Sequence, residues 1–435
     1  MKLDKIFLKA SNIKSSILDL PASKSLTNRI LLIASLCSDQ TIINNMLFSD
    51  DTLVMIDALK KLGVKIKLNK TLKQCHIIGS HNKFPVKIAD LYIGNAGTAI
   101  RPLTACLAFN DGKYKIHGTP RMHERPISDL VNSLKSIGAK IEYLQNPDYP
   151  PLLIKQSYVK SNKIIIKGNI SSQFLTSLLI ASPIISKENN LNIKVEGDLI
   201  SKPYADITLN LIKLFNLKIK RQKYNSFQIN AGQAYKSPKV IKVEGDASSA
   251  TYFLAAASIC GKRIKVKGIG AKSIQGDIKF VEILKKMGAD IIVHDDYIIS
   301  NSKKQLIAID EDLNHIPDAA MTVAMLCLYA NGTSILRNIG SWRVKETDRL
   351  SAMTKELSKL GAQITEGKDF LKIKPPKIML DASIDTYEDH RMAMCFSLAS
   401  LNSKFLKGSN ITINDPKCVA KTFPNYFEVF KSILI

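Results

Sequence analysis

The sequence predicts an α/β fold in which six repeats form two similar domains. Two patterns that recur in step along the chain support this prediction, together with the length of 435 residues. A chain of this length is too long for one core of ordinary size, and its hydrophobic content of 45% can supply two.

The first pattern is a helix end followed by a strand. Residues 59–66 read Leu-Lys-Lys-Leu-Gly-Val-Lys-Ile, and close variants recur at residues 134–141, 284–291 and 357–364. A degenerate copy at residues 213–219 has Asn216 in place of the glycine. Glycine and asparagine adopt the left-handed conformation that ends many helices, so we expect a helix, a turn and a strand at each place.

The second pattern is a polar helix start followed by an apolar helix. It occurs six times, at steps of 71 to 76 residues, near residues 25, 96, 172, 247, 319 and 390. Alternating segments at residues 91–93, 163–166 and 264–266 are typical of strands. Strands that alternate with two helices in each repeat predict an α/β fold.

Three repeats in each domain require the chain to cross between the domains twice. The expected crossings are Pro21-Ala22-Ser23 and Val243-Glu244-Gly245, because each precedes a polar helix start. The predicted domains are residues 1–20 plus 244–435, formed by both chain ends, and residues 21–243. If the six helix starts face a common cleft, their free N–H groups make it attractive to anions, although capping alone explains any single start.

The formal net charge of +24 suggests a polyanion partner such as nucleic acid. The lysines are spread over every segment, however, and aromatic residues make up only 7% of the chain, too few for a base-stacking surface. We therefore expect no nucleic-acid partner, and a polyanion-binding protein remains the non-enzymatic alternative.

The ten arginines are more informative, because arginine grips carboxylate and phosphate groups with two parallel hydrogen bonds. Seven of them lie in short polar segments: Arg29, Arg101, Arg121, Arg125, Arg343, Arg349 and Arg391. This placement predicts recognition of oxyanions.

The compartment is expected to be the cytoplasm. Apolar runs fall short of the roughly 18 residues that a membrane span needs, and the first 19 residues leave no room for a targeting peptide. The seven cysteines are odd in number and scattered, which predicts reduced thiols and no metal or redox motif.

The segment from Trp342 to Arg349 combines the only tryptophan with alternating charges. On a helix, Glu346 and Lys345 would lie three and four residues from Arg349, which places a carboxylate beside two cations. Exposed salt bridges are the alternative explanation for this spacing, and core packing is the expected role of Trp342.

Several segments together resemble the 5-enolpyruvylshikimate-3-phosphate synthase family. They are Ser23-Lys24-Ser25-Leu26-Thr27-Asn28-Arg29, residues 94–103, 121–126, Ser171-Ser172-Gln173, Ser201-Lys202-Pro203-Tyr204, 244–249, 314–318, 342–349, Asp389-His390-Arg391 and 415–423. The resemblance implies two domains of three βαβαββ units each, which close over a cleft. It also implies transfer of the enolpyruvyl group of phosphoenolpyruvate to the 5-hydroxyl of shikimate 3-phosphate, as part of the shikimate pathway, with no metal or organic cofactor.

The resemblance also implies roles for individual residues. Asp318 would accept the proton of the 5-hydroxyl group. Glu346 would transfer a proton to the methylene carbon of phosphoenolpyruvate and take it back from the new methyl group, and Lys24 would assist proton transfer at oxygen. Phosphoenolpyruvate would bind to Lys24, Gly97, Arg125, Gln173, Arg349, Arg391 and Lys421. Shikimate 3-phosphate would bind to Lys24, Ser25, Arg29, Ser171, Ser172, Gln173, Ser201, Tyr204, Asp318, Ser341 and Lys345. We expect the dense positive charge to keep Asp318 ionised.

Two residues depart from the family's usual pattern. Ala22 stands where glycine is common, and Ser341 stands where asparagine is common. A monomer that acts only on small molecules is expected. UDP-N-acetylglucosamine enolpyruvyl transferase, which shares the fold, is the enzymatic alternative, but its closing loop carries a reactive cysteine and residues 118–126 contain none.

Overall fold

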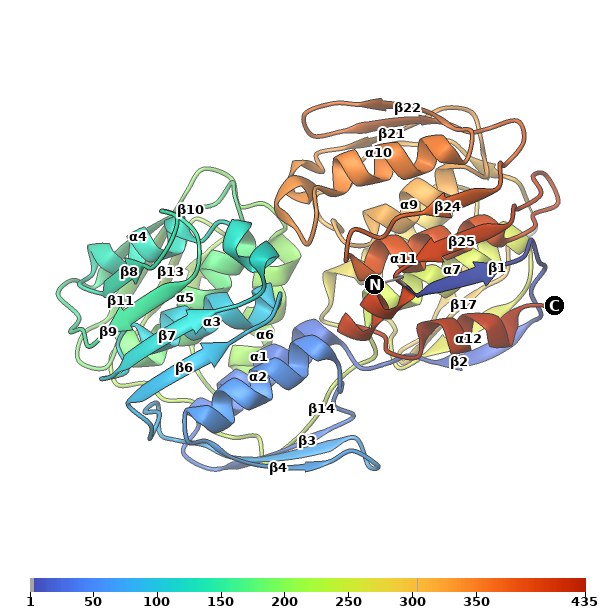
Figure 1. The fold of residues 1–435 in the computed structure, drawn as a ribbon. Coiled ribbons are helices and arrows are strands. Elements are labelled where there is room, and N and C mark those ends of the chain that lie inside the picture. Colours follow the sequence, from blue (N-terminus) through green and yellow to red (C-terminus); the bar gives the residue numbers. More distant parts are fainter. Residues whose placement is uncertain (1–3, 303) are drawn as a thin grey trace. The chain divides into compact units, whose positions relative to one another are not determined.

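The computed structural model describes residues 4–302 and 304–435, and the predicted α/β fold is confirmed. The chain divides into two compact units (Figure 1). Unit 1 comprises Met1–Pro21 and Glu244–Ile435, and unit 2 comprises Ala22–Val243.

Unit 2 contains three copies of one βαβαββ repeat. The first is β14 (Val240–Lys242), α1 (Lys24–Leu36), β3 (Gln40–Asn44), α2 (Asp50–Lys61), β4 (Lys65–Asn69) and β5 (Gln74–Ile78). The second is β6 (Ile88–Tyr92), α3 (Gly97–Leu107), β7 (Lys113–His117), α4 (Ser128–Ser136), β8 (Lys140–Tyr143) and β9 (Leu152–Lys155), with η1 (Pro120–Glu124) before α4. The third is β10 (Lys163–Lys167), α5 (Ser172–Ile185), β11 (Leu191–Glu196), α6 (Lys202–Leu214), β12 (Ile219–Gln222) and β13 (Ser226–Ile229).

Unit 1 also has three repeats, but only the first two follow the same order; the third departs from the expected βαβαββ pattern, because it has two strands of its own and its sheet is completed by β1 (Lys5–Leu8). The first copy is β2 (Ser16–Asp19), α7 (Ala247–Cys260), β15 (Ile264–Lys267), η2 (Gly276–Lys279), α8 (Phe280–Lys286), β16 (Ile291–Val293) and β17 (Tyr297–Ser300). The second is β19 (Asp310–Asp312), α9 (Ala320–Cys327), β21 (Ser334–Arg337), η3 (Gly340–Val344), α10 (Arg349–Lys359), β22 (Gln363–Glu366) and β23 (Leu371–Lys374), flanked by the short pair β18 (Leu306–Ile307) and β20 (Ala330–Asn331). The third is β24 (Ala382–Ile384), α11 (His390–Ser397), η4 (Leu398–Ser400), β25 (Ile411–Asn414), η5 (Pro416–Lys421) and α12 (Tyr426–Ile433).

Five sheets share one topology. In the sheet β6-β7-β9-β8, for example, β6 and β7 are parallel and the other neighbours are antiparallel. The sixth sheet has the order β1-β25-β24, and β1 (Lys5–Leu8) pairs antiparallel with β25. The first repeat of each unit borrows its first strand from a distant part of the chain, because β14 pairs with β3 and β2 pairs with β15.

The first helix of each repeat forms the core of its unit. All residues of α9 and α11 are buried, as are nearly all those of α1, α3, α5 and α7. Helices that are apolar on every side must be enclosed. The lysine and arginine side chains of these helices all lie in the first two turns, so their charged groups gather at the N-terminal ends; they are Lys24, Arg29, Arg101 and Arg391.

The predicted helix ends are confirmed. Gly63, Gly138, Gly288 and Gly361 have φ angles between +88° and +109°, and Asn216 has +58°. Each follows a helix and precedes a strand, as the repeated motif indicates.

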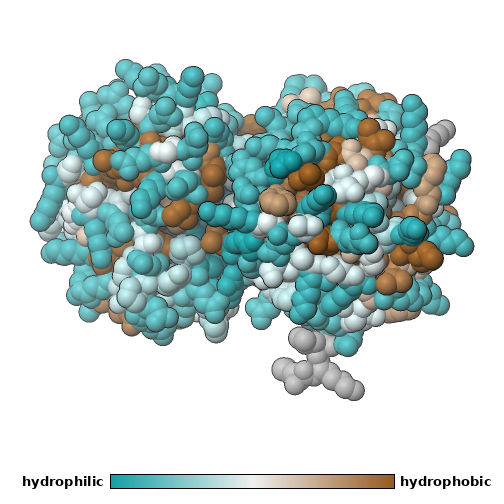
Figure 2. Space-filling view, turned by 90° about the horizontal axis from the view of Figure 1, so that it is seen from above, coloured by the Kyte–Doolittle hydropathy of each residue, from teal (hydrophilic) through white to brown (hydrophobic). Residues whose placement is uncertain are grey.

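The surface fits the composition. On the face shown in Figure 2, hydrophilic residues cover most of each unit and apolar residues lie among them in small groups. The seven cysteines are free, and five of them are buried. In the described part of the chain, no helix combines the length and apolar character that crossing a membrane requires.

Gly288 allows the helix-end motif to be tested without steric side effects. A Cβ placed there would meet only the carbonyl oxygen of Gln305, at 3.9 Å. We predict that Gly288→Ala lowers the free energy of unfolding by about 1 kcal/mol, because an alanine is forced into the left-handed region. Chemical denaturation would measure this loss against Lys285→Ala, a control in the preceding helix. Equal midpoints for the two variants would contradict the prediction.

Candidate active site

A buried guanidinium gathers three carboxylates in unit 1. Arg349, the first residue of α10, is 1% exposed. Its Nε donates to Asp389 Oδ2 at 2.7 Å, while its two terminal nitrogens donate to Asp318 Oδ1 and Glu346 Oε2, each at 2.9 Å. These carboxylates precede α11, α9 and α10 respectively, so one side chain connects the N-terminal ends of three helices.

The segment that carries Glu346 is not helical, contrary to our expectation. Helix α10 begins only at Arg349, because the Asp348 side chain accepts a hydrogen bond from the Ser351 amide at 3.2 Å and caps the helix there. The expected contact of Glu346 with Arg349 is nevertheless present, since the turn before a helix brings residues three apart together as a helix does.

Asp318 is surrounded by cations. Its Oδ2 accepts a hydrogen bond from Arg391 at 2.9 Å, and the Lys345 ammonium lies 3.7 Å from its Oδ1. Burial by itself raises the pKa of Asp318, but the charges of Arg391, Lys345 and Arg349 hold this pKa well below its usual range. Asp318 is therefore a carboxylate at neutral pH, as we expected.

The pKa of Lys345 is lowered as well. Burial lowers the pKa of its ammonium group, and the nearby Arg349 lowers it further, although Asp318 and Glu346 raise it. A cation that is poorly solvated gains more from an anionic ligand than an exposed lysine does.

Trp342 has a positioning role that the sequence did not indicate. It is fully buried, as predicted, and its indole Nε1 donates to the carbonyl oxygen of Pro317 at 2.7 Å. This hydrogen bond fixes η3 to the residue that precedes Asp318. The neighbouring Ser341 Oγ is buried and has no hydrogen-bond partner among the residues the structure describes.

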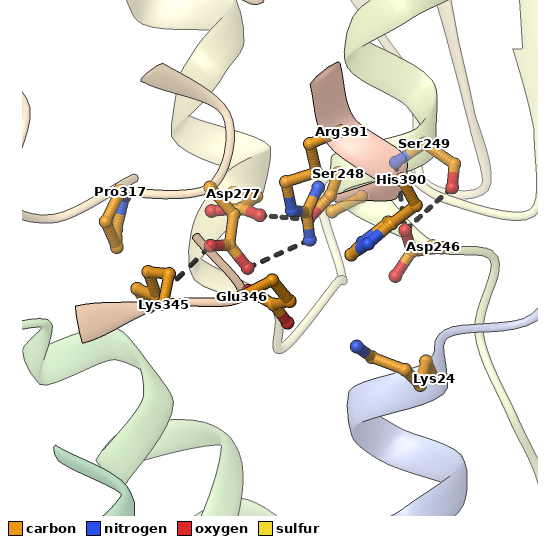
Figure 3. A network of polar contacts seen from close by, with 12 residues as sticks. Lys24, Asp246, Ser248, Ser249, Asp277, Pro317, Lys345, Glu346, His390 and Arg391 are labelled. Atoms are coloured by element: carbon orange, nitrogen blue, oxygen red, sulfur yellow. Dashed lines mark hydrogen bonds and ion pairs between the residues drawn. The ribbon is translucent and has the colours of Figure 1, made fainter. Parts of the chain in front are cut away.

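Arg391 also contacts side chains that our prediction missed. Its terminal nitrogens lie 3.4 Å from Tyr252 Oη and from Ser248 Oγ, and the Ser248 hydroxyl donates to Asp277 (Figure 3). Asp277 lies in η2, directly before α8. In the sequence it looks like an ordinary aspartate in the first turn of a helix, so only the structure reveals its hydrogen bond with Ser248.

The loop that precedes α11 is held by a buried glutamate. Tyr387 and Glu388 both have positive φ angles, +54° and +56°, which are unfavourable for residues other than glycine. The Glu356 side chain, fully buried in α10, accepts hydrogen bonds from the Tyr387 hydroxyl at 2.6 Å and from the Asp385 amide at 3.1 Å. The next turn carries Asp389 and Arg391, so Glu356 supports their placement.

In unit 2, the polar start of α1 is tied to two other helices. The Lys24 ammonium lies 3.1 Å from Asp51 Oδ2 in α2. Arg29 donates to Thr208 Oγ1 of α6 at 3.0 Å and to the Ser25 carbonyl at 2.9 Å. Burial lowers the pKa of Arg29 to about 10.

Gly97 opens α3 beneath two guanidinium groups. A Cβ at this position would come within 2.6 Å of Arg101 Nη1 and 2.8 Å of Arg125 Nη2, so a larger residue would have to displace the ends of these two side chains. Arg125 donates to the Asn95 carbonyl at 3.0 Å, and Arg101 donates to Gln173 Oε1 at 2.5 Å. A helix N-terminus flanked by two guanidinium groups favours an anion.

The other predicted residues lie on neighbouring elements. Ser171 caps α5, where its hydroxyl accepts from the Gln173 amide at 3.3 Å, and Ser172 begins that helix. Ser201 precedes α6 with a φ of +51°, and the Tyr204 amide donates to its carbonyl at 3.1 Å. Lys421, which is buried, ends η5, an element that packs against α11.

The predicted residues therefore form several groups. In unit 1, one network joins Asp318, Lys345, Glu346, Arg349 and Arg391. In unit 2, one group contains Lys24, Ser25 and Arg29 and another contains Gly97, Arg125 and Gln173. Within residues 4–302 and 304–435, no three or more His, Cys, Asp or Glu side chains are arranged to hold a metal ion.

The importance of the Arg349 network can be compared with a similar exposed pair. Asp389, fully buried, accepts two hydrogen bonds from Arg349, and Asp310, half exposed, accepts two from Arg337. We predict that Asp389→Asn lowers the free energy of unfolding by about 3 kcal/mol, because a buried guanidinium loses a charged partner. Asp310→Asn should leave the denaturation midpoint nearly unchanged. Similar losses for both variants would refute this dependence on burial.

The chain is similar to known proteins over nearly its whole length. The family model described as EPSP synthase (3-phosphoshikimate 1-carboxyvinyltransferase) matches residues 8–430. The 3-phosphoshikimate 1-carboxyvinyltransferase of Herminiimonas arsenicoxydans is 56% identical over 414 residues, which cover 95% of this chain and 94% of that protein. The enzyme of the same name from Janthinobacterium sp. (strain Marseille) is 55% identical over 426 residues, 98% of this chain and 97% of that one.

Solved structures show the same fold at lower identity. EPSP synthase from Acinetobacter baumannii has a TM-score of 0.80 at 24% identity, with 99% of this chain and 98% of that chain covered. The enolpyruvyl transferase NikO from Streptomyces tendae has a TM-score of 0.76 at 14% identity, again over 99% and 98% of the two chains. The polyanion-binding and UDP-N-acetylglucosamine alternatives are not favoured by these relatives. The chain belongs to the EPSP synthase (3-phosphoshikimate 1-carboxyvinyltransferase) family, and it is therefore a transferase of the shikimate pathway.

Proposed function

We propose that this chain transfers the enolpyruvyl group of phosphoenolpyruvate to the 5-hydroxyl of shikimate 3-phosphate and releases phosphate. The observation that carries the proposal is the position of Asp318 between Arg349 and Arg391, with Glu346 on the same guanidinium. One carboxylate that stays ionised and a second beside it provide the base and the acid that addition to an enol phosphate requires.

The proposal assigns anion recognition to the cationic groups of each unit. The two substrates together carry two phosphates and two carboxylates, which arginine binds in a bidentate manner. We assign phosphoenolpyruvate to Lys24, Gly97, Arg125, Gln173, Arg349, Arg391 and Lys421. We assign shikimate 3-phosphate to Lys24, Ser25, Arg29, Ser171, Ser172, Gln173, Ser201, Tyr204, Asp318, Ser341 and Lys345.

The first step is addition. Asp318 takes the proton of the 5-hydroxyl group. At the same time the oxygen of that hydroxyl group forms a bond to C2 of phosphoenolpyruvate. Glu346 delivers a proton to the methylene carbon, so the double bond becomes a methyl group and a tetrahedral intermediate forms. The low pKa of Asp318 keeps it in the basic form, and the hydroxyl proton moves only as the new bond develops.

The second step is elimination. Glu346 takes a proton back from the new methyl group, the bond between C2 and the phosphate oxygen breaks, and the double bond re-forms. Lys24 assists proton transfer at oxygen as the phosphate leaves, and the proton that Asp318 took from the hydroxyl group passes to the departing phosphate, so both carboxyl groups return to their starting states. Every step is a proton transfer or a carbon–oxygen bond change, so the chemistry needs no redox partner, and we propose that no metal or organic cofactor takes part.

The cellular context completes the proposal. The two units are the two domains of the enzyme, and it acts as a monomer in the cytoplasm on small molecules, without nucleic acid. The spread of lysines over the whole chain supports the last point.

The acceptor distinguishes this function from its alternatives. We expect phosphate release from phosphoenolpyruvate in the presence of shikimate 3-phosphate and none with UDP-N-acetylglucosamine. A coupled phosphate assay measures both. Release only with the second acceptor would overturn the proposal.

The role of Glu346 can be tested separately from binding. We predict that Glu346→Gln lowers kcat by at least about 100-fold, because the amide cannot transfer the carbon proton. Calorimetry should show shikimate 3-phosphate binding within about threefold of wild type, since the side chain keeps its shape. Glu142→Gln, in an exposed pair with Lys155, is the control and should keep full activity. Retained turnover in Glu346→Gln would remove Glu346 from the mechanism.

A further inference from the structure

Asp277 is a buried carboxyl group to which the proposed mechanism gives no role. It is 6% exposed, lies in η2, and accepts a hydrogen bond from the hydroxyl of Ser248. Ser248 belongs to the first turn of α7. Figure 3 shows Asp277 and Ser248 beside Arg391.

Ser248 connects Asp277 to Arg391. One terminal nitrogen of Arg391 lies 3.4 Å from Ser248 Oγ and 2.9 Å from Asp318 Oδ2, and the other lies 3.4 Å from Tyr252 Oη. The guanidinium is thus held by the Asp318 carboxylate and by two hydroxyl groups of α7. Asp277 orients the Ser248 hydroxyl, because the Ser248 proton points to the carboxyl group and leaves an oxygen lone pair for Arg391.

We propose that Asp277 is a positioning residue for phosphoenolpyruvate: through Ser248 it fixes Arg391, and its own ionisation sets how much of the Arg391 charge is available to the substrate. This inference rests on the proposed role of Arg391 in binding phosphoenolpyruvate. Asp277 itself does not contact the reacting atoms.

The charges around Asp277 explain why its carboxyl group can gain or lose a proton near neutral pH. Asp318 and Arg391 face it from the segment before α9 and from α11, while Ser248 and Asp246 face it from the start of α7. Burial, followed by the charge of Asp318, raises the pKa of Asp277 to about 7, although Arg391 and the Ser248 hydrogen bond oppose this shift.

Asp318 differs because it has additional cations. Lys345 and Arg349 contact Asp318, and Arg349 is shared in turn with Glu346 and Asp389. Asp318 therefore remains ionised, and Asp277 is the carboxyl group that gains or loses its proton near neutral pH. Once Asp277 ionises, Arg391 balances two carboxylates and attracts an anionic substrate less strongly.

The expected effect is a pH-dependent difference between wild type and Asp277→Asn. The ratio of the KM for phosphoenolpyruvate in wild type to that in Asp277→Asn should rise by about threefold to tenfold between pH 6 and pH 8.5, because only wild type acquires the extra negative charge. The ratio cancels the ionisation of the substrate itself. Asp310→Asn, on the surface, is the control and should give a constant ratio. A purely structural role would change the KM equally at every pH, so a constant ratio for Asp277→Asn would overturn the inference.

Ser248→Ala tests the connection. It should raise the KM for phosphoenolpyruvate at pH 6, where Asp277 is neutral, because Arg391 loses one of its two hydroxyl partners. An unchanged KM would show that Asp277 does not act through Ser248.

Thermal stability gives a measurement that does not depend on activity. The pKa of Asp277 is higher in the folded chain than in an unfolded one, so its contribution to stability is fully present below about pH 4 and is lost as the pH rises to about 7. The Tm of Asp277→Asn should therefore rise relative to wild type across this window. A constant difference in Tm would overturn the assigned ionisation.

Absence of phosphate release by wild type would overturn the proposed function, whereas an active wild type with a constant KM ratio would overturn only this inference.

Discussion

The buried guanidinium of Arg349 is the interaction on which unit 1 depends. Removing such a group from water costs several kcal/mol unless charged partners surround it, and here Asp318, Glu346 and Asp389 do so. Because these partners precede three different helices, the ion pairs also set where α9, α10 and α11 begin relative to one another. The contacts that stabilise the unit are thus the same contacts that arrange the proposed acid and base.

Several of the cations assigned to the substrates are already paired with carboxylates within the protein. Lys24 contacts Asp51, and Arg391 contacts Asp318. An anionic ligand must therefore compete with internal carboxylates, and its affinity is the difference between two sets of ion pairs. This competition has a benefit, because the side chains are held in place before the ligand arrives and little reorganisation is left for the reaction.

The repeats made most of the fold predictable. Asn216 and the four glycines end helices because the left-handed conformation restricts the choice of residue, and such a local rule is visible in sequence. Motif residues of the site were predictable through resemblance. The partners that hold them were not: Asp389 is 40 residues from Arg349, and Glu356 is 31 from Tyr387. Such contacts arise when repeats stack, and a buried carboxylate looks like an exposed one in sequence. The charge spacing of residues 345–349 likewise fits a helix, and spacing alone does not reveal that the helix begins only at Arg349.

The pairing of strands that lie far apart in the chain has a consequence for protein synthesis. Unit 2 is one continuous stretch that ends with β14, so it can complete its sheets as soon as residue 243 has left the ribosome. Strand β1, by contrast, pairs with β25, about 400 residues later. At about 5 to 20 residues per second, this N-terminal segment waits for roughly 20 to 80 seconds of translation before its partner exists. The nascent chain therefore carries an unpaired strand through most of its synthesis, which is the period in which chaperones that recognise exposed apolar segments can act on it.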